Sequence, residues 1–544
     1  MKLIVNNQEI IKNNPLTLEE LAKELEITAY CASVNHRIRE LTFVVKKDAT
    51  INFLGLNSVD SMNLYVASLR YVMAMAIKNL YPNARIIFNN SISRAFYCEI
   101  KNIGFISNVV LKKIENEMLD IIEKDYKITR VTLPKEKALE LYEKLGYDDK
   151  ARILVYRPEN TCHFYECNGY LNYMFSYMVP STGYLKQFKL LQYSQGIIVQ
   201  YPRSELNGTI PAFEDAPTFS NALREANKWG EICGGSYVSQ MNKLIEEKKE
   251  LEFINLCETK HNDMLAELGL KIKSDIDNIR LIAVAGPSSS GKTTFTNRLR
   301  IELMSRGIKP LMISIDNYYK SKKDAPKDED GNPDLEHIDA LDTELFNQQM
   351  FSLINGEEVT LPIFNFETGK REWGETVKVD SHSPILIEGI HALNDYLTPS
   401  IPAHQKFKIF IAPNAQLHLD DENPISITEL RLLRRLVRDK KFRNSKAEET
   451  LSMWPSVRRG EFRWIYKSQE GANYVFNSEL TYEICVLKKY ALPMLEEIDS
   501  ESPYYIQANR LVKFLKYFKD IEDDWIPCNS ILREFIGGSS FYRK

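Results

Sequence analysis

Residues 280–293 read Arg-Leu-Ile-Ala-Val-Ala-Gly-Pro-Ser-Ser-Ser-Gly-Lys-Thr. The apolar run Leu281 to Ala285 predicts a buried strand, and Phe295, Leu299 and Leu303 mark one face of a helix that follows it. Between strand and helix lies the spacing G-x-x-x-x-G-K-T, which is typical of a P-loop. The alternative is a glycine turn with a purely structural role.

In a P-loop, the two glycines let the backbone curl so that its N–H groups and the helix N-terminus face phosphate oxygens. Lys292 is expected to contact the β- and γ-phosphates of ATP, and the Thr293 hydroxyl is expected to ligate Mg²⁺. ATPases, GTPases and kinases share this loop, so the loop alone does not choose among them. The predicted phosphate-binding residues are Gly286, Pro287, Ser288, Ser289, Ser290, Gly291, Lys292, Thr293 and Thr294.

Two carboxylates follow later apolar runs of the same kind. Asp316 comes just after Leu311 to Ile315, and Glu388 ends the run Ile385 to Ile387. Continuous apolar runs predict a parallel sheet covered on both faces, and ligands bind at the carboxyl edge of such sheets. There Asp316 could accept a hydroxyl proton, and both acids could hold Mg²⁺. The alternatives are an aspartate that caps a turn and a glutamate at the surface.

A helix is predicted from Glu429 to Arg443, with Ser426 and Glu429 as a capping box. Four arginines lie at i, i+3, i+4 and i+7 on one face, namely Arg431, Arg434, Arg435 and Arg438. Like charges at this spacing destabilise a helix, so they call for an anionic partner such as a triphosphate in transfer. The alternative is a solvated basic face.

The front half is less distinctive. Thr17 and Glu20 predict a capping box within a small sheet wrapped on one helix, and a long helix is expected from Ser61 to Leu80. The Glu- and Lys-rich stretch 222–270 is predicted to be a helical connector that is split at Gly234-Gly235.

The composition excludes several classes of protein. The 544 residues carry 70 Lys plus Arg and 74 Asp plus Glu, a formal charge of −4, so the chain is not basic throughout. The first ten residues do not fit a signal peptide, no apolar run approaches the roughly 18 residues of a membrane span, and the eight cysteines are scattered. We therefore expect a cytoplasmic protein with reduced thiols and no membrane contact.

The second half resembles the uridine kinase family over roughly residues 278–487. The motifs that carry the resemblance are Gly286 to Thr293, Asp316 to Tyr319, His337-Ile-Asp339-Ala-Leu-Asp342, Pro362-Ile-Phe-Asn-Phe366, Ile387-Glu-Gly389 and Arg434-Arg435-Leu-Val-Arg438-Asp439. The resemblance implies transfer of the ATP γ-phosphate to the 5′-hydroxyl of a nucleoside. By the same comparison, the implied roles are catalytic for Asp316, Lys292, Arg435 and Arg438, substrate-binding for Asp339, Tyr319, Phe364 and Arg443, and Mg²⁺-binding for Thr293, Asp316 and Glu388.

This chain departs from the family pattern at two places. The stretch that in the family typically reads Y-D-F-x-x-H is here Phe364-Asn365-Phe366-Glu367-Thr368-Gly369, so the base-reading histidine is missing and base preference is open. The lid sequence R-G-R is here Arg443-Asn444-Ser445, which weakens the comparison at the second arginine.

The front half resembles two parts of a tRNA enzyme. Residues 1 to about 60 resemble a TGS domain, a β-grasp module, and Val179 to Lys189 is among the stretches similar to the editing domain of threonyl-tRNA synthetase. The metal-binding or deacylating His and Cys residues of that domain are replaced here by Ala67, Tyr71, Met174 and Met178. The fold is therefore expected to remain and the hydrolytic chemistry to be lost. Cys162, His163 and Cys167 are the only nearby soft ligands.

We therefore predict a multidomain α/β and α+β protein. The expected parts are a TGS-like β-grasp domain (1–60), an α+β editing-like domain (61–221), a helical connector (222–277), a P-loop uridine kinase-like domain with a parallel sheet flanked by helices (278–487) and a helical C-terminal extension (488–544). The first hypothesis is an ATP-dependent nucleoside kinase. One alternative is a kinase for another hydroxyl acceptor, such as a sugar phosphate. A second is an RNA- or tRNA-binding protein that is switched by nucleotide. The chain could also form a homo-oligomer.

Overall fold

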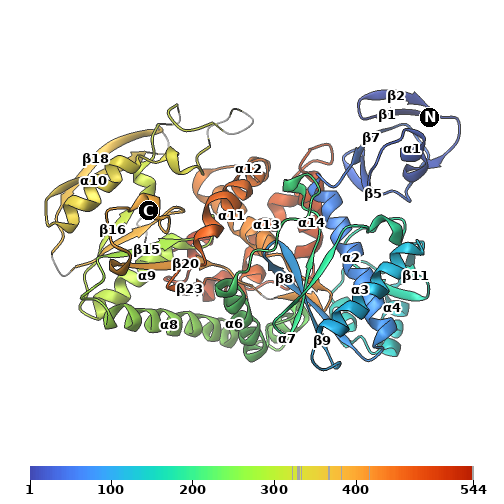
Figure 1. The fold of residues 1–544 in the computed structure, drawn as a ribbon, viewed down its shortest axis with the longest axis horizontal. Coiled ribbons are helices and arrows are strands. Elements are labelled where there is room, and N and C mark those ends of the chain that lie inside the picture. Colours follow the sequence, from blue (N-terminus) through green and yellow to red (C-terminus); the bar gives the residue numbers. More distant parts are fainter. Residues whose placement is uncertain are drawn as a thin grey trace.

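The computed structural model describes residues 1–321, 323–327, 331, 334–365, 368–380, 383–415 and 417–541. The molecule is elongated, with the N-terminal sheets at one end and the parallel sheet of the P-loop at the other (Figure 1). Among the described residues, no helix is both long and apolar enough to cross a membrane.

The first unit is a mixed sheet of order β2-β1-β7-β4-β5 that packs on one helix. Leu18 and Leu21 of that helix are fully buried, and Thr17 with Glu20 forms the predicted capping box. The helix is α1 (Leu18–Glu24), and the strands are β1 (Lys2–Val5), β2 (Gln8–Ile11), β4 (Cys31–Val34), β5 (Arg37–Glu40) and β7 (Ala49–Leu54), with a small pair β3 (Leu16–Thr17) and β6 (Val44–Val45) beside them.

The second unit contains two antiparallel sheets around a long buried helix, α2 (Val59–Leu80), which ends just before Tyr81-Pro82 as predicted. The sheet orders are β13-β14-β9-β8 and β10-β11-β12. The strands are β8 (Arg85–Ile92), β9 (Ala95–Lys101), β10 (Thr129–Pro134), β11 (Thr161–Cys167), β12 (Tyr170–Tyr173), β13 (Lys189–Tyr193) and β14 (Gly196–Gln200), and the further helices are α3 (Asn108–Glu123), α4 (Lys135–Leu145) and α5 (Asp148–Leu154).

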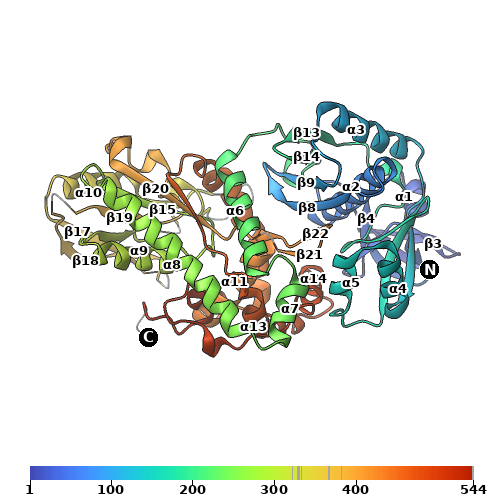
Figure 2. The ribbon, with the colours of Figure 1, turned by 90° about the horizontal axis from the view of Figure 1, so that it is seen from below.

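Three helices connect the two ends of the molecule: α6 (Pro217–Cys233), α7 (Val238–Glu246) and α8 (Glu250–Ser274). Helix α6 ends at Gly234, whose φ of +66° is the left-handed conformation that glycine adopts most easily, so the predicted split is confirmed. Helix α8 runs along the end of the molecule that carries the P-loop (the P-loop end) and packs against α9 (Lys292–Ser305) (Figure 2).

The P-loop end is built on a wholly parallel sheet of order β16-β19-β15-β20-β23. Strand β15 is central and buried along its whole length, which explains its unbroken apolar sequence. Because the chain passes from β15 to strands on both sides, its carboxyl end is a topological switch point, where α/β proteins bind ligands. The strands are β15 (Leu281–Ala285), β16 (Leu311–Ser314), β19 (Ile385–Glu388), β20 (Lys406–Ala412) and β23 (Tyr474–Asn477).

Several further elements belong to this half of the molecule. They are α10 (Thr343–Ile354), the hairpin β17 (Val359–Asn365) and β18 (Lys370–Val377), the hairpin β21 (His418–Asp420) and β22 (Asn423–Pro424), and the helices α11 (Ile427–Arg443), α12 (Ala447–Gly460), α13 (Glu483–Glu496), α14 (Tyr505–Leu515) and α15 (Arg533–Ile536). Helix α11 begins after Ser426, but the predicted capping box is wrong because Glu429 instead pairs with Arg510 of α14 at 3.0 Å.

Candidate active site

The loop between β15 and α9 has the shape that its glycines predict. Gly286 lies so close to β20 that a Cβ atom there would stand 2.0 Å from the carbonyl oxygen of Ile411, so no other residue fits. Ser289 adopts a left-handed conformation with φ of +59°. The hydroxyl oxygens of Ser289, Ser290 and Thr294 are buried and have no hydrogen-bond partner within the part of the chain that the structure describes. The loop thus contains buried polar groups that a ligand could satisfy with hydrogen bonds.

The lysine of the motif is folded against the loop itself. Lys292 Nζ donates hydrogen bonds to the carbonyl oxygens of Gly286 at 2.9 Å and Pro287 at 3.1 Å. Burial lowers the pKa of Lys292, while the negative charges of Glu388 and Asp316 act in the opposite direction. The ammonium group is therefore surrounded by acids of the same site.

Asp316 and Glu388 lie at the carboxyl edge of two neighbouring parallel strands, as their positions after apolar runs predicted. Glu388 ends β19 and is in register with Ser314, whose hydroxyl donates to Glu388 Oε1 at 2.7 Å. Burial raises the pKa of Asp316, and the charges of Lys292 and Arg443 oppose that shift. Burial and the charge of Asp316 raise the pKa of Glu388 to about 7. Two carboxylates thus share one ammonium group.

Two of the four arginines predicted to meet an anion find their partner within the chain. Arg431 is fully buried in an ion pair with Glu461, and Arg434 is fully buried in an ion pair with Glu483 at 2.7 Å. The prediction that these arginines meet a triphosphate is wrong for both, because their partners are glutamates of downstream elements that only the tertiary fold brings close.

The remaining lid arginines share one carboxylate. Asp439 lies 3.3 Å from Arg435, 2.8 Å from Arg438 and 3.5 Å from Arg443. Arg435 also donates to the hydroxyl of Ser288 in the phosphate loop at 2.9 Å. Asp439 thus gathers three guanidinium groups beside the loop, and guanidinium groups bind anions such as phosphate.

The predicted substrate residues lie beside Asp316 but differ in exposure. Tyr319 and Phe364 have ring centroids 5.9 Å apart, and the charge of Asp316 contributes to the raised pKa of Tyr319 after burial. Asp339 is 58% exposed, and its backbone N–H donates to His337 Nδ1. Phe366 and Glu367 of the base-reading stretch lie outside the described residues.

The structure adds site residues that the sequence analysis did not identify. Burial and the charge of Glu461 raise the pKa of Glu336 to about 7, and Lys292 and Arg435 act against that shift. Glu461 accepts a hydrogen bond from the Ser288 backbone N–H at 3.2 Å. The only available signal was that Glu336 directly precedes the His337 motif; Glu461 sits in a π-helical turn (Glu461–Ile465) that no local pattern indicates.

The four front-half positions that replace His and Cys are packed in one apolar cluster. Ala67, Tyr71, Met174 and Met178 are each at most 8% exposed. The Tyr71 hydroxyl bonds to the carbonyl oxygens of Tyr165 and Tyr170. Cys162 and Cys167 are also buried, while His163 Nδ1 lies 2.9 Å from the Thr132 hydroxyl.

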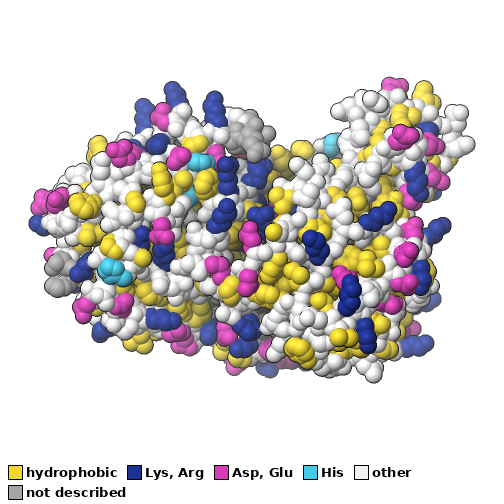
Figure 3. Space-filling model, in the orientation of Figure 1, with side chains coloured by type: hydrophobic (Ala, Val, Ile, Leu, Met, Phe, Trp, Pro, Cys, Tyr) yellow, Lys and Arg dark blue, Asp and Glu magenta, His cyan; other side chains and the backbone are white. Residues whose placement is uncertain are grey.

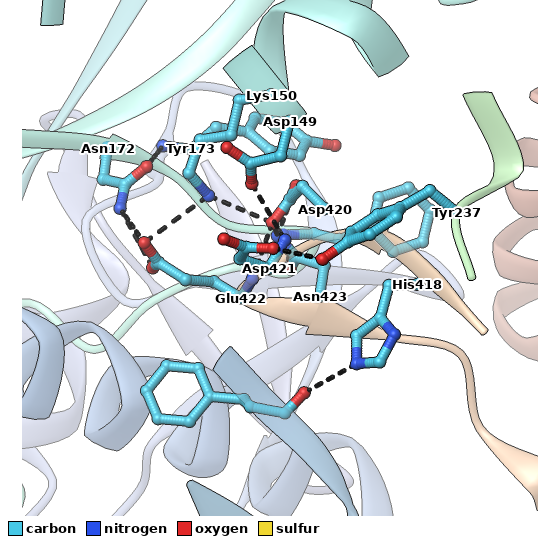
Figure 4. A network of polar contacts seen from close by, with 12 residues as sticks. Asp149, Lys150, Asn172, Tyr173, Tyr237, His418, Asp420, Asp421, Glu422 and Asn423 are labelled. Carbon is cyan, nitrogen blue, oxygen red and sulfur yellow. Dashed lines mark hydrogen bonds and ion pairs between the residues drawn. The ribbon is translucent and has the colours of Figure 1, made fainter. Parts of the chain in front are cut away.

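A network of polar contacts, here called the junction, links this unit to the P-loop end of the molecule (Figure 4). The turn Asp420–Asn423 of the β21–β22 hairpin reaches into the second unit, where Lys150 Nζ lies 3.0 Å from Asp420 and 3.5 Å from Glu422. Arg85 makes a two-point contact with Asp421, and Phe88 N–H donates to the Asp421 carbonyl at 2.8 Å. The hairpin leads directly into α11, so the junction lies next in the chain to the helix that carries the arginines.

Comparisons with known proteins give a match for each half of the chain. Residues 281–484 match the family model described as "Phosphoribulokinase / Uridine kinase family". The N-terminal region is similar to threonine-tRNA ligases. It is 30% identical over 184 residues to the ligase of Acetivibrio thermocellus, which covers 33% of this chain and 29% of the ligase. It is 31% identical over 183 residues to the ligase of Geobacillus sp. (strain WCH70), which covers 33% of this chain and 28% of that ligase. The chain therefore spans about three tenths of the length of these ligases.

Among solved structures, one described as "a Possible Uridine Kinase from Bacillus stearothermophilus" is 21% identical and covers 40% of this chain and 98% of its own, with a TM-score of 0.26 that is too low to support an argument about function. The family match, the parallel sheet and the phosphate loop coincide in the same residues. The C-terminal region of the chain is a domain of the phosphoribulokinase/uridine kinase family, and its N-terminal region is similar to part of the threonine-tRNA ligases.

Proposed function

We propose that this protein transfers the γ-phosphate of ATP to the 5′-hydroxyl of a nucleoside. The observation that carries the proposal is the meeting of the phosphate loop, Lys292, Asp316 and Glu388 at one edge of the sheet. The unpartnered hydroxyls of the loop fit phosphate oxygens, which accept hydrogen bonds from O–H groups. A kinase needs both a phosphate cradle and an acid beside the acceptor hydroxyl, and this edge supplies both.

In this proposal each side chain has a defined task. Lys292 leaves the loop carbonyls to bind the β- and γ-phosphates, and Arg435 and Arg438 stabilise the charge on the phosphoryl group in transfer. Asp316 accepts the proton of the attacking hydroxyl, and burial, which raises its pKa, makes the carboxylate a stronger base. Arg443 lies close enough to Asp316 to keep that carboxylate ionised.

The residues present fit Mg²⁺. Asp316, Glu388 and the Thr293 hydroxyl are hard oxygen donors, and the charge of Asp316 already raises the pKa of Glu388, which a divalent cation between them would reverse. Mg²⁺ would neutralise charge on the phosphates. Ser314 would orient the Glu388 carboxylate through its 2.7 Å hydrogen bond.

For the acceptor, Tyr319, Phe364 and Asp339 are the proposed contacts. The aromatic pair Tyr319 and Phe364 lies beside Asp316 and offers apolar faces to a base. Asp339 is exposed, with its carboxylate 3.7 Å from His337 Nδ1, and is the proposed contact for ribose hydroxyls. The test is a coupled ADP-release assay with ATP and Mg²⁺ against uridine, cytidine, thymidine, adenosine, guanosine and inosine. Release of ADP with at least one nucleoside supports the proposal, and release with none while ATP still binds points to another acceptor.

For the front unit we propose that editing chemistry is lost, because the four replaced positions carry no imidazole or thiol and are packed in the core. Hydrolysis of an aminoacyl-tRNA by the full chain would contradict this. On the face seen in Figure 3, basic and acidic side chains are interspersed over this unit, which does not favour RNA binding there. A filter-binding assay with tRNA at low salt tests that alternative.

A further inference from the structure

The C-terminal residues lie directly on the phosphate loop. Gly291 has φ of +87°, and a Cβ atom there would stand 2.4 Å from Ile531 Cγ2. Ile531 and Phe535 are fully buried, and the Phe535 ring lies 5.1 Å from the guanidinium carbon of Arg434. Helix α15 packs on α11, and Lys441 of α11 donates to the Ile536 carbonyl oxygen at 2.5 Å. The chain end is thus part of the wall of the nucleotide site.

One side chain of this segment occupies a phosphate-binding amide. Thr294 is the third residue of α9, so its backbone N–H has no partner within the helix. That N–H donates to Glu534 Oε2 at 2.9 Å. Free amides at a helix N-terminus after a Gly-rich loop are the groups that hold phosphate oxygens, because the helix dipole favours an anion there. A carboxylate of the chain itself therefore stands in a position suited to a phosphate.

Glu534 has fewer ionic contacts than the other carboxylate on a loop amide. That carboxylate, Glu461, is fixed by ion pairs with Arg431 and Arg458. Within the described part of the chain, Glu534 forms no ion pair within 4 Å. Its negative charge acts on two groups of the site: it contributes to the raised pKa of Glu388, which it repels, and it is attracted by the charge of Lys292.

We infer that Glu534 is an internal competitor for the phosphate loop, which a nucleotide must displace before it binds fully. The inference rests on the proposed function, because it takes the loop to be the site of ATP. When phosphate arrives, the Thr294 amide exchanges one anion for another, while Ile531 and Phe535 must loosen from Gly291 and α11. The segment then limits nucleotide affinity rather than forming a passive wall.

The test compares Glu534→Gln with wild type by calorimetry, using MgATP and, separately, magnesium pyrophosphate as probes. The Gln variant keeps the size and the acceptor oxygen but removes the charge, so both probes are expected to bind about 3- to 30-fold more tightly, the range of an anion at a helix N-terminus. Asp524→Asn is the matched control, since Asp524 is exposed in the same segment, and it is expected to change neither affinity.

Hydrogen exchange provides the second measurement. Saturating MgATP is expected to speed amide exchange in residues 526–541 of the wild-type chain. Equal or weaker binding by Glu534→Gln, or unchanged exchange, would overturn the inference and leave the kinase proposal standing. If neither probe binds either protein, the phosphate site itself is wrong, and both the proposed function and the inference fall. Point variants are used because deletion of the segment would remove Ile531 and Phe535 and uncover the faces of the loop and of α11 on which they pack.

Discussion

Replacement of Lys150 by Met would remove the buried cation of the junction between the second unit and the P-loop end. The Lys150 ammonium lies 3.0 Å from Asp420, and both side chains are at most 3% exposed. Burial alone would lower the pKa of Lys150, but Asp420, Glu422 and Asp149 outweigh it and raise that pKa well above its usual value. The lysine is therefore charged at neutral pH.

The expected cost follows from the charges that remain. Removing one partner of a buried ion pair typically costs about 3 to 5 kcal/mol, because the other charge stays buried without compensation. Among the described residues, the network joins four carboxylates, Asp149, Asp420, Asp421 and Glu422, to Lys150 and Arg85. The charge of the partly buried Lys78 also acts on Glu422 and Asp149. Lys150 is the buried cation that contacts Asp420 and Glu422, so we expect the upper part of the range.

The Phe88 amide is a reporter placed at the junction, since it donates across it to the Asp421 carbonyl. Under conditions in which exchange reports the opening equilibrium, Lys150→Met should speed exchange of this amide by a factor on the order of 10³. Lys124→Met is the control, because Lys124 pairs with Asp120 at the surface, where such pairs are worth about 1 kcal/mol or less. A change below tenfold for Lys150→Met would refute the reasoning.

Three further substitutions test the active site. Lys292→Ala should abolish phosphoryl transfer, with an unchanged circular dichroism spectrum as the control, and retained turnover would exclude the loop mechanism. Asp316→Asn should reduce kcat by a factor on the order of 10² to 10⁴ if it is the general base, whereas a loss below tenfold would leave it only a positioning role. Ser314→Ala, which frees the Glu388 carboxylate, should raise the Mg²⁺ concentration needed for half-maximal rate about 10- to 100-fold, and an unchanged Mg²⁺ titration would argue against Glu388 as a ligand.

Local patterns were enough to place the phosphate loop, Asp316 and Glu388. Each follows an apolar run, and parallel strands bring their carboxyl ends to one edge, so the juxtaposition follows from the strand pattern alone. The same holds for the Thr17 capping box and the end of α6 at Gly234, which depend on residues only a few positions apart.

Long-range pairing could not be predicted in this way. Arg431 and Arg434 have the spacing of a free basic face, but their partners, Glu461 and Glu483, lie 30 and 49 residues downstream. Glu534 reaches Thr294 across 240 residues. In each case the sequence holds both groups, while only the packing of distant elements decides that they meet.

The central claim is that this chain moves a phosphoryl group from ATP to a nucleoside hydroxyl. The most direct test supplies ATP labelled in the γ-phosphate, with Mg²⁺ and each nucleoside in turn, and follows the label by mass spectrometry. We expect the label in a nucleoside 5′-monophosphate with the wild-type chain and none with Lys292→Ala. Label released only as inorganic phosphate, or remaining in ATP with every nucleoside, would contradict the account.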